Sequence, residues 1–182
     1  MEHLLWTDME MTGLDPIKSQ ILEIASVLTD KSLTVVATGP RLVVHCAASV
    51  LEAMDSWNRR THRSSGLWEE ALASKLSLQE AEQQCVDFLQ AHCPNKKLIL
   101  AGNSIWQDRR FITLYLPRLD ERLHYRMVDV SSLKILNELW SSPDQRYTKK
   151  TYQHRALADI EESIAELRYY RDHLLASPNS AN

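Results

Sequence analysis

The chain has 182 residues, 44% of them hydrophobic and 25% charged, which is typical of one globular domain around one core. No apolar run approaches the roughly 18 residues that span a bilayer, and no signal or transit peptide is recognisable, so we predict a cytoplasmic protein without a membrane segment. The formal net charge of −3 argues against a protein that grips long nucleic acid through a basic surface.

The first quarter of the chain is predicted to form strands. The first of them carries Asp8 to its end, and Gly13 with Asp15-Pro16 marks the turn that follows. The third is interrupted by Gly39-Pro40, which indicates a bend or bulge. We expect an antiparallel meander of three strands, over residues 4–9, 21–29 and 33–44.

The rest of the chain alternates helices with short strands. Ser77 and Glu80 fit a capping box that opens a helix running to about His92. Residues 98–101 (LILA) are wholly apolar, which is typical of a buried central strand. The other predicted elements are helices over 48–60, 106–116, 131–140 and 155–175, a strand over 127–130, and polar loops over 61–66 and 141–153.

This order of elements predicts an α/β fold. Three antiparallel strands followed by βα units imply a mixed five-stranded sheet flanked by helices, the RNase H-like layout. We expect residues 1–182 to form a single domain, with a flexible tail from about residue 176.

Asp8 and Glu10 are the first candidates for chemistry. Residues two apart in a strand point to one face, so these two carboxylates lie together and repel each other. A divalent cation between them relieves that repulsion, and Mg²⁺ prefers carboxylate oxygens. Taken alone, such a pair is more often two solvated surface acids than a metal site.

Three further residues extend the pair. Asp108 falls in the first turns of a helix that follows the buried strand, and His154 and Asp159 lie where a basic loop meets the last helix. Three or four carboxylates can hold two Mg²⁺ or Mn²⁺ ions that stabilise both the attacking and leaving oxygens of a phosphodiester. A histidine with an unperturbed pKa of ~6.5 can then take a proton from the attacking water. Asp108 and Asp159 are also compatible with the ordinary role of acids at helix starts.

With these residues in place, the chain resembles the oligoribonucleases, members of the DEDDh exonuclease superfamily. The resemblance covers nearly the whole length. It runs through residues 8–15 (DMEMTGLD), 54–57 (MDSW), 65–67 (SGL), 102–104 (GNS), 108–111 (DRRF), 124–126 (HYR), 129–131 (DVS) and 160–171 (IEESIAELRYYR).

The resemblance implies roles for individual residues. The metal-binding acids are expected to be Asp8, Glu10, Asp108 and Asp159, with His154 as general base. Leu14 matches a wedge beside the terminal bases and Trp57 a residue lining the nucleotide pocket, although both are also compatible with a place in the core. Ser104 resembles a contact to the 5′ phosphate, which Tyr125, Arg126 and Ser131 complete, Tyr125 and Arg126 being donated by the other subunit of a homodimer.

The family resemblance also implies a substrate. It is short single-stranded RNA of two to five nucleotides, with dinucleotides preferred, degraded 3′→5′ to 5′-mononucleotides. Two positions depart from the family pattern: Ala158 replaces a second acid before Asp159, and Thr7 replaces an aliphatic residue before Asp8. Neither removes an expected catalytic group.

Two other functions stay open from the sequence. The first is an exonuclease for longer single-stranded DNA, which would need a wider groove and no phosphate cap. The second is a catalytically silent binding module on the same fold, although all five expected catalytic side chains are present.

Overall fold

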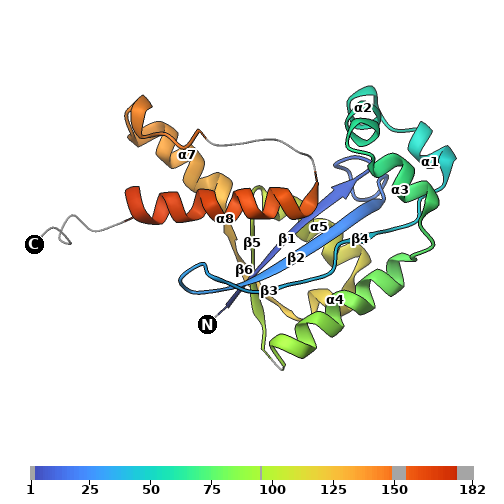
Figure 1. The fold of residues 1–182 in the computed structure, drawn as a ribbon, viewed down its shortest axis with the longest axis horizontal. Coiled ribbons are helices and arrows are strands. Elements are labelled where there is room, and N and C mark those ends of the chain that lie inside the picture. Colours follow the sequence, from blue (N-terminus) through green and yellow to red (C-terminus); the bar gives the residue numbers. More distant parts are fainter. Residues whose placement is uncertain (1–2, 95, 149–154, 176–182) are drawn as a thin grey trace, which may run out of the picture.

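The computed structural model describes residues 3–94, 96–148 and 155–175. The expected flexible tail and His154 lie outside these residues. Helices cover both faces of a central sheet: α8 (Ala156–His173) lies on one face, and α4 (Leu78–His92) and α5 (Ile105–Tyr115) lie on the other (Figure 1).

The sheet is mixed, as predicted, but the predicted number of strands is wrong. The described residues form six strands, not five: β1 (His3–Met11), β2 (Ile21–Asp30), β3 (Val35–Thr38), β4 (Leu42–Val43), β5 (Leu98–Gly102) and β6 (Leu123–Asp129). Their order is β3-β2-β1-β5-β6, and β4 also pairs with β2. Gly39-Pro40 splits the predicted third strand into β3 and β4, both antiparallel to β2. The meander and the parallel pairing of β1, β5 and β6 follow the expected pattern.

The helices differ from the prediction mainly before residue 74. The predicted helix over 48–60 is two helices, because the Asp55 side chain accepts the Trp57 and Asn58 amide protons and starts a new one. The predicted loop over 61–66 is mostly helical, and a third helix follows it. The remaining helices are α1 (Ala48–Glu52), α2 (Ser56–Ser64), α3 (Leu67–Ala73), α6 (Pro117–Asp120) and α7 (Val130–Trp140), with a 3₁₀ turn at Pro143–Gln145.

The alternation of β1 divides the core in two. Leu5 and Met9 pack toward α4 and α5, whereas Trp6 packs with Ile160, Ile164 and the rest of the buried side of α8. Asp8 and Glu10 lie at even positions like Trp6, so they point toward the α8 face. Strand β1 runs three residues beyond Asp8, further than predicted. Within the described part of the chain, no helix is both long and apolar enough to cross a bilayer.

Candidate active site

Three carboxylates from the two ends of the chain meet on the α8 face of β1. Asp8 and Glu10 come from the strand, and Asp159 comes from the first turn of α8. One oxygen of each lies within 4.8 Å of the others, and all three side chains are half-buried. We call these three residues the acidic cluster. The structure therefore brings together three of the four acids expected to bind metal.

Without a cation, burial and mutual repulsion make the charged forms of the acidic cluster unfavourable. Burial raises the pKa of Asp8 well above its usual value, and the charges of Asp108, Glu10, Asp159 and Glu23 raise it further. Burial, again followed by neighbouring carboxylates, raises the pKa of Glu10 to about 8. Glu10 therefore holds a proton near neutral pH unless a positive charge binds beside it.

Asp108 lies beside the acidic cluster without sharing its 4.8 Å group. It is 6% exposed, in the first turn of α5. Burial raises its pKa to about 7, against the opposing effect of backbone N–H groups, including that of Met9. Its charge in turn raises the pKa of Asp8. Asp108 is therefore electrostatically linked to the acidic cluster, as a fourth ligand would be.

The donor set fits hard divalent cations. Carboxylate oxygens are the ligands that Mg²⁺ and Mn²⁺ prefer. Several buried acids that raise one another's pKa are stabilised by a cation more than by any single proton. Asp8, Glu10 and Asp159 would hold such an ion, with Asp108 next to them.

Ser104 and Ser131 also come together in the structure. The amide N–H of Ser104 donates to the Ser131 Oγ at 2.9 Å, and their two hydroxyl oxygens lie 3.2 Å apart. Asn103 fixes the pair, because its Oδ1 accepts the Ser131 hydroxyl proton at 3.1 Å while its Nδ2 donates to Glu166 of α8 at 3.0 Å. Ser104 adopts the left-handed conformation, with φ +51°. Because the Ser131 proton goes to Asn103, the Ser104 hydroxyl at the start of α5 is the one of the two that can donate to an anion.

Leu14 and Trp57 are surface residues, not core residues. Leu14 is 71% exposed in the turn after β1, and its carbonyl oxygen accepts a hydrogen bond from the Gln107 side chain on α5. Trp57 is 53% exposed in the first turn of α2. Exposed apolar side chains of this size are available to contact bases.

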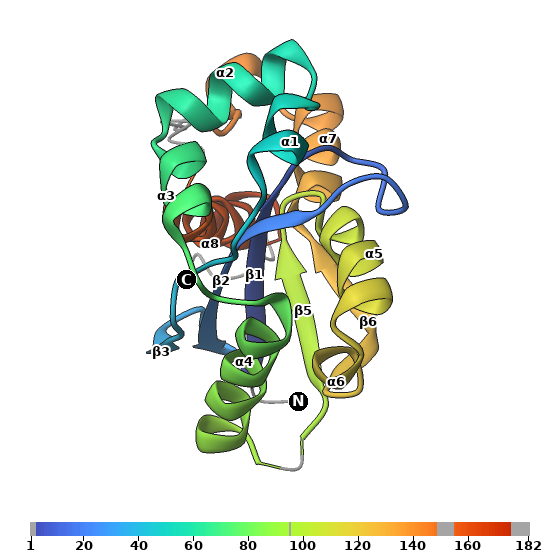
Figure 2. The ribbon, with the colours of Figure 1, turned by 90° about the vertical axis from the view of Figure 1, so that its right-hand side faces the viewer.

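Tyr125 and Arg126 lie apart from the acids within one chain. They belong to β6, at the edge of the sheet, and β5 separates that strand from β1 (Figure 2). Tyr125 is 75% exposed, and the Arg126 guanidinium lies 5.3 Å from its ring centre. This position is compatible with contact to another molecule.

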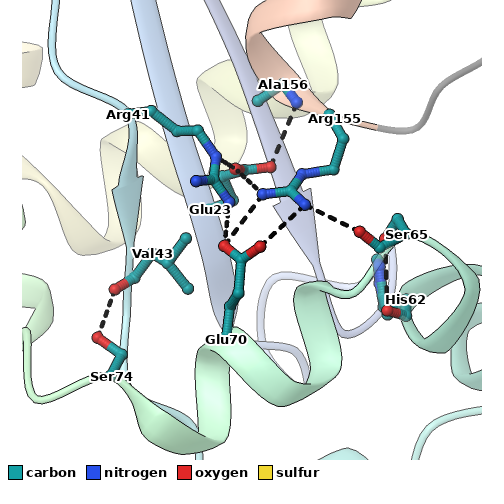
Figure 3. A network of polar contacts seen from close by, with 9 residues as sticks. All are labelled: Glu23, Arg41, Val43, His62, Ser65, Glu70, Ser74, Arg155 and Ala156. Carbon is teal, nitrogen blue, oxygen red and sulfur yellow. Dashed lines mark hydrogen bonds and ion pairs between the residues drawn. The ribbon is translucent and has the colours of Figure 1, made fainter.

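Two groups near the acidic cluster were missed by the sequence analysis. His62 of α2 is buried, donates from Nε2 to the Met11 carbonyl at 3.0 Å, and places Nδ1 3.9 Å from the Glu10 carboxylate. Glu23 of β2 is fully buried and belongs to a network with Arg41, Glu70 and Arg155 (Figure 3). The sequence did contain a signal for Glu23, because it is a charged residue within a largely apolar strand.

Known proteins resemble this chain over most of its length. A family model described as an exonuclease, RNase T, matches residues 5–167. The oligoribonuclease of Bordetella pertussis is 54% identical over 172 residues, which are 94% of this chain and 95% of that protein. The oligoribonuclease of Aromatoleum aromaticum is 51% identical over 173 residues, 95% of this chain and 94% of that one.

Solved structures support the fold. Exonuclease I from Methylocaldum szegediense superposes with a TM-score of 0.72 at 18% identity, covering 94% of this chain and 41% of that chain. That likeness confirms the RNase H-like α/β fold. The family match, the two relatives and the acidic cluster together show that the chain belongs to the oligoribonuclease family of exonucleases.

Proposed function

We propose that this chain is a 3′→5′ exoribonuclease that hydrolyses RNA of two to five nucleotides, dinucleotides above all, to 5′-mononucleotides. The observation that carries the proposal is the convergence of Asp8, Glu10 and Asp159 in a protein whose relatives are named oligoribonuclease. Residues 1–182 act as a single catalytic domain in this proposal.

The chemistry assigns a task to each residue. Two divalent cations, Mg²⁺ or Mn²⁺, supply positive charge to the attacking and leaving oxygens when bound. Asp8, Glu10, Asp108 and Asp159 provide the oxygen ligands. His154 accepts the proton of the attacking water, because a neutral imidazole is a competent base near pH 7.

The preference for short RNA is assigned to groups away from the acids. Ser104 and Ser131 bind the 5′ phosphate, and Tyr125 and Arg126 of the partner subunit close over it, with the planar guanidinium suited to phosphate oxygens. Leu14 and Trp57 contact the bases by wedging and stacking, without reading sequence. A net charge of −3 suits a substrate too short to need a long basic groove.

A direct assay tests this function. The purified protein is incubated with 5′-phosphorylated RNA of two, five and twenty nucleotides, with Mg²⁺ or with EDTA. We expect the dinucleotide to disappear fastest, and only with metal. Equal or faster loss of the twenty-nucleotide RNA would overturn the short-substrate assignment. No loss with any divalent metal would favour a silent binding module.

The dimer is proposed to form through the edge at β6. Exposed apolar side chains gather on β6, α5 and α7, and a surface of this kind usually marks a protein interface. They are Trp106, Leu114, Tyr125, Met127, Ile135, Leu139 and Trp140. In a dimer formed through this edge, Tyr125 and Arg126 of one subunit reach the 5′-phosphate site of the other and complete it.

Leu139→Lys on α7 tests the dimer. We expect a mass near twice the chain mass of 21.0 kDa for the parent and a monomer for the variant, by sedimentation equilibrium. Val36→Lys is the matched control, since Val36 is 51% exposed on β3 at the opposite edge of the sheet, and it should stay dimeric. A dimeric Leu139→Lys protein, or a monomeric parent, would contradict the proposal.

A further inference from the structure

Arg155, the residue before α8, joins three separate parts of the fold. Its Nη1 donates to the carbonyl oxygen of Ser65 at 2.9 Å, and the guanidinium grips both oxygens of Glu70, each at 3.1 Å (Figure 3). Its Nη2 also donates to Glu23 at 3.3 Å. Ser65 ends α2, Glu70 lies on α3 and Glu23 on β2. One side chain therefore fixes the start of α8 against two helices and the sheet.

Glu23 is the buried end of this network. Its side chain is 0% exposed and shares a face of β2 with Ala25 and Val27, the face that α8 covers. One carboxylate oxygen accepts from Arg155 and from Arg41, and the other accepts the backbone N–H of Ala156 at 3.3 Å. The last contact satisfies a helix N–H that has no partner within the helix. A carboxylate far away in sequence therefore caps the first turn of α8.

This first turn carries Asp159. The backbone N–H of Asp159 donates to the carbonyl oxygen of Arg155 at 3.0 Å, so the two residues move as one turn of helix. The Arg155 side chain makes no capping bond to the helix itself. The position of Asp159 relative to Asp8 and Glu10 consequently depends on contacts between the start of α8 and other elements. Arg155 makes such contacts with α2, α3 and β2.

We propose that Arg155 is a positioning residue that holds Asp159 in the acidic cluster, with Glu23 and Glu70 as its anchors. The inference rests on the proposed metal-dependent function and goes beyond it. Arg155 touches neither metal nor substrate in this assignment; it acts through the first turn of α8. A lysine cannot replace it, because an ammonium group lacks the planar fork that grips Glu70 with two parallel hydrogen bonds while reaching Ser65.

The positive charge of Arg155 and its role in positioning Asp159 predict opposite effects of its removal on metal binding. Arg155 carries a positive charge one helical turn before Asp159, and like charges repel, so removing that charge should by electrostatics alone tighten metal binding. If Arg155 positions Asp159, removing it should instead weaken binding, because one ligand is no longer held in place. Arg155→Lys separates the two effects further, since it keeps the charge and loses the geometry.

The experiment measures Mn²⁺ affinity directly, without substrate. The signal of free Mn²⁺ is followed by electron paramagnetic resonance as the protein is titrated in. We expect Arg155→Lys and Arg155→Gln each to bind Mn²⁺ about tenfold more weakly than the parent, as for other residues that orient a ligand. Arg171→Lys is the matched control: Arg171 lies at the far end of α8, where it also binds a backbone carbonyl and a carboxylate, and it should bind like the parent.

A double substitution tests whether the effect passes through Asp159. Once Asp159→Asn has removed the ligand charge, adding Arg155→Lys should weaken binding no further. Unchanged or tighter binding by Arg155→Lys would overturn the inference, as would an additive effect in the Asp159→Asn protein. If Arg155→Gln does not fold, Arg155→Lys alone decides. A parent protein that binds no Mn²⁺ would overturn the proposed function and this inference together. If the parent binds Mn²⁺ and Arg155→Lys binds it equally well, only the inference fails.

Discussion

Asp8→Asn is expected to lower kcat by on the order of 10³-fold or more, because it removes a carboxylate that no neighbour can replace. The fold should survive. Burial and the surrounding acids hold the pKa of Asp8 well above its usual value, so the parent protein is destabilised by this charge. An amide of the same shape removes the conflict, and the midpoint of thermal unfolding in EDTA should rise.

Turnover of a 5′-phosphorylated dinucleotide and thermal unfolding in EDTA are the two measurements. Asp87→Asn, which changes an exposed carboxylate on α4, is the control and should alter neither. Activity of Asp8→Asn above a few per cent of the parent would contradict the catalytic assignment. A lower unfolding midpoint would contradict the electrostatic one.

Metal-free protein is expected to lose stability as the pH rises from about 4.5 to about 8. Glu10 has a pKa of about 8 in the folded protein, against an ordinary pKa of 4.5 for a glutamate carboxyl group. The unfolded chain releases this proton first, so the folded state is favoured below pH 4.5 and progressively disfavoured up to pH 8. The loss attributable to Glu10, whose side chain is 16% exposed, is on the order of 4 kcal/mol. Asp108, with a pKa of about 7, adds to the same trend.

Urea unfolding at pH 5 and pH 8, with EDTA or with Mg²⁺, measures this effect. Mg²⁺ should stabilise the protein much more at pH 8, where it binds acids that have already lost their protons. Glu10→Gln should flatten the pH dependence in EDTA. A metal-free parent that is more stable at pH 8 than at pH 5 would have the wrong sign and would refute the electrostatic account.

Helices and strands that are determined by a local sequence signal were predicted correctly. The apolar run before Gly102 formed β5, and the Ser77–Glu80 capping box started α4 where expected. The break between α1 and α2 was missed because Asp55 looks like an ordinary exposed acid, and its capping bonds appear only in three dimensions. Helix α3 was missed because Gly66 suggested a loop, yet Leu67 and Ala71 have the spacing of a buried helical face.

The candidate site was predictable only in part. The strand period placed Asp8 and Glu10 on one face, and Asp159 was a candidate because of its place at the start of the last helix. No local pattern relates the three residues in space, and the family resemblance was needed to assign Asp159 to the same metal site. The contacts of Arg155 with Glu23 and Glu70 span 132 and 85 residues of sequence. Such pairs depend on how α8 packs on the sheet, which composition and periodicity do not determine.

The position of α8 has a consequence for biosynthesis. Asp8 and Glu10 leave the ribosome early, whereas Asp159 and the helix that carries it are made near the end of the described chain. Contacts between segments so far apart in sequence form late, since the intervening chain must first be ordered. A growing chain therefore holds two acids without the third until α8 has emerged and packed.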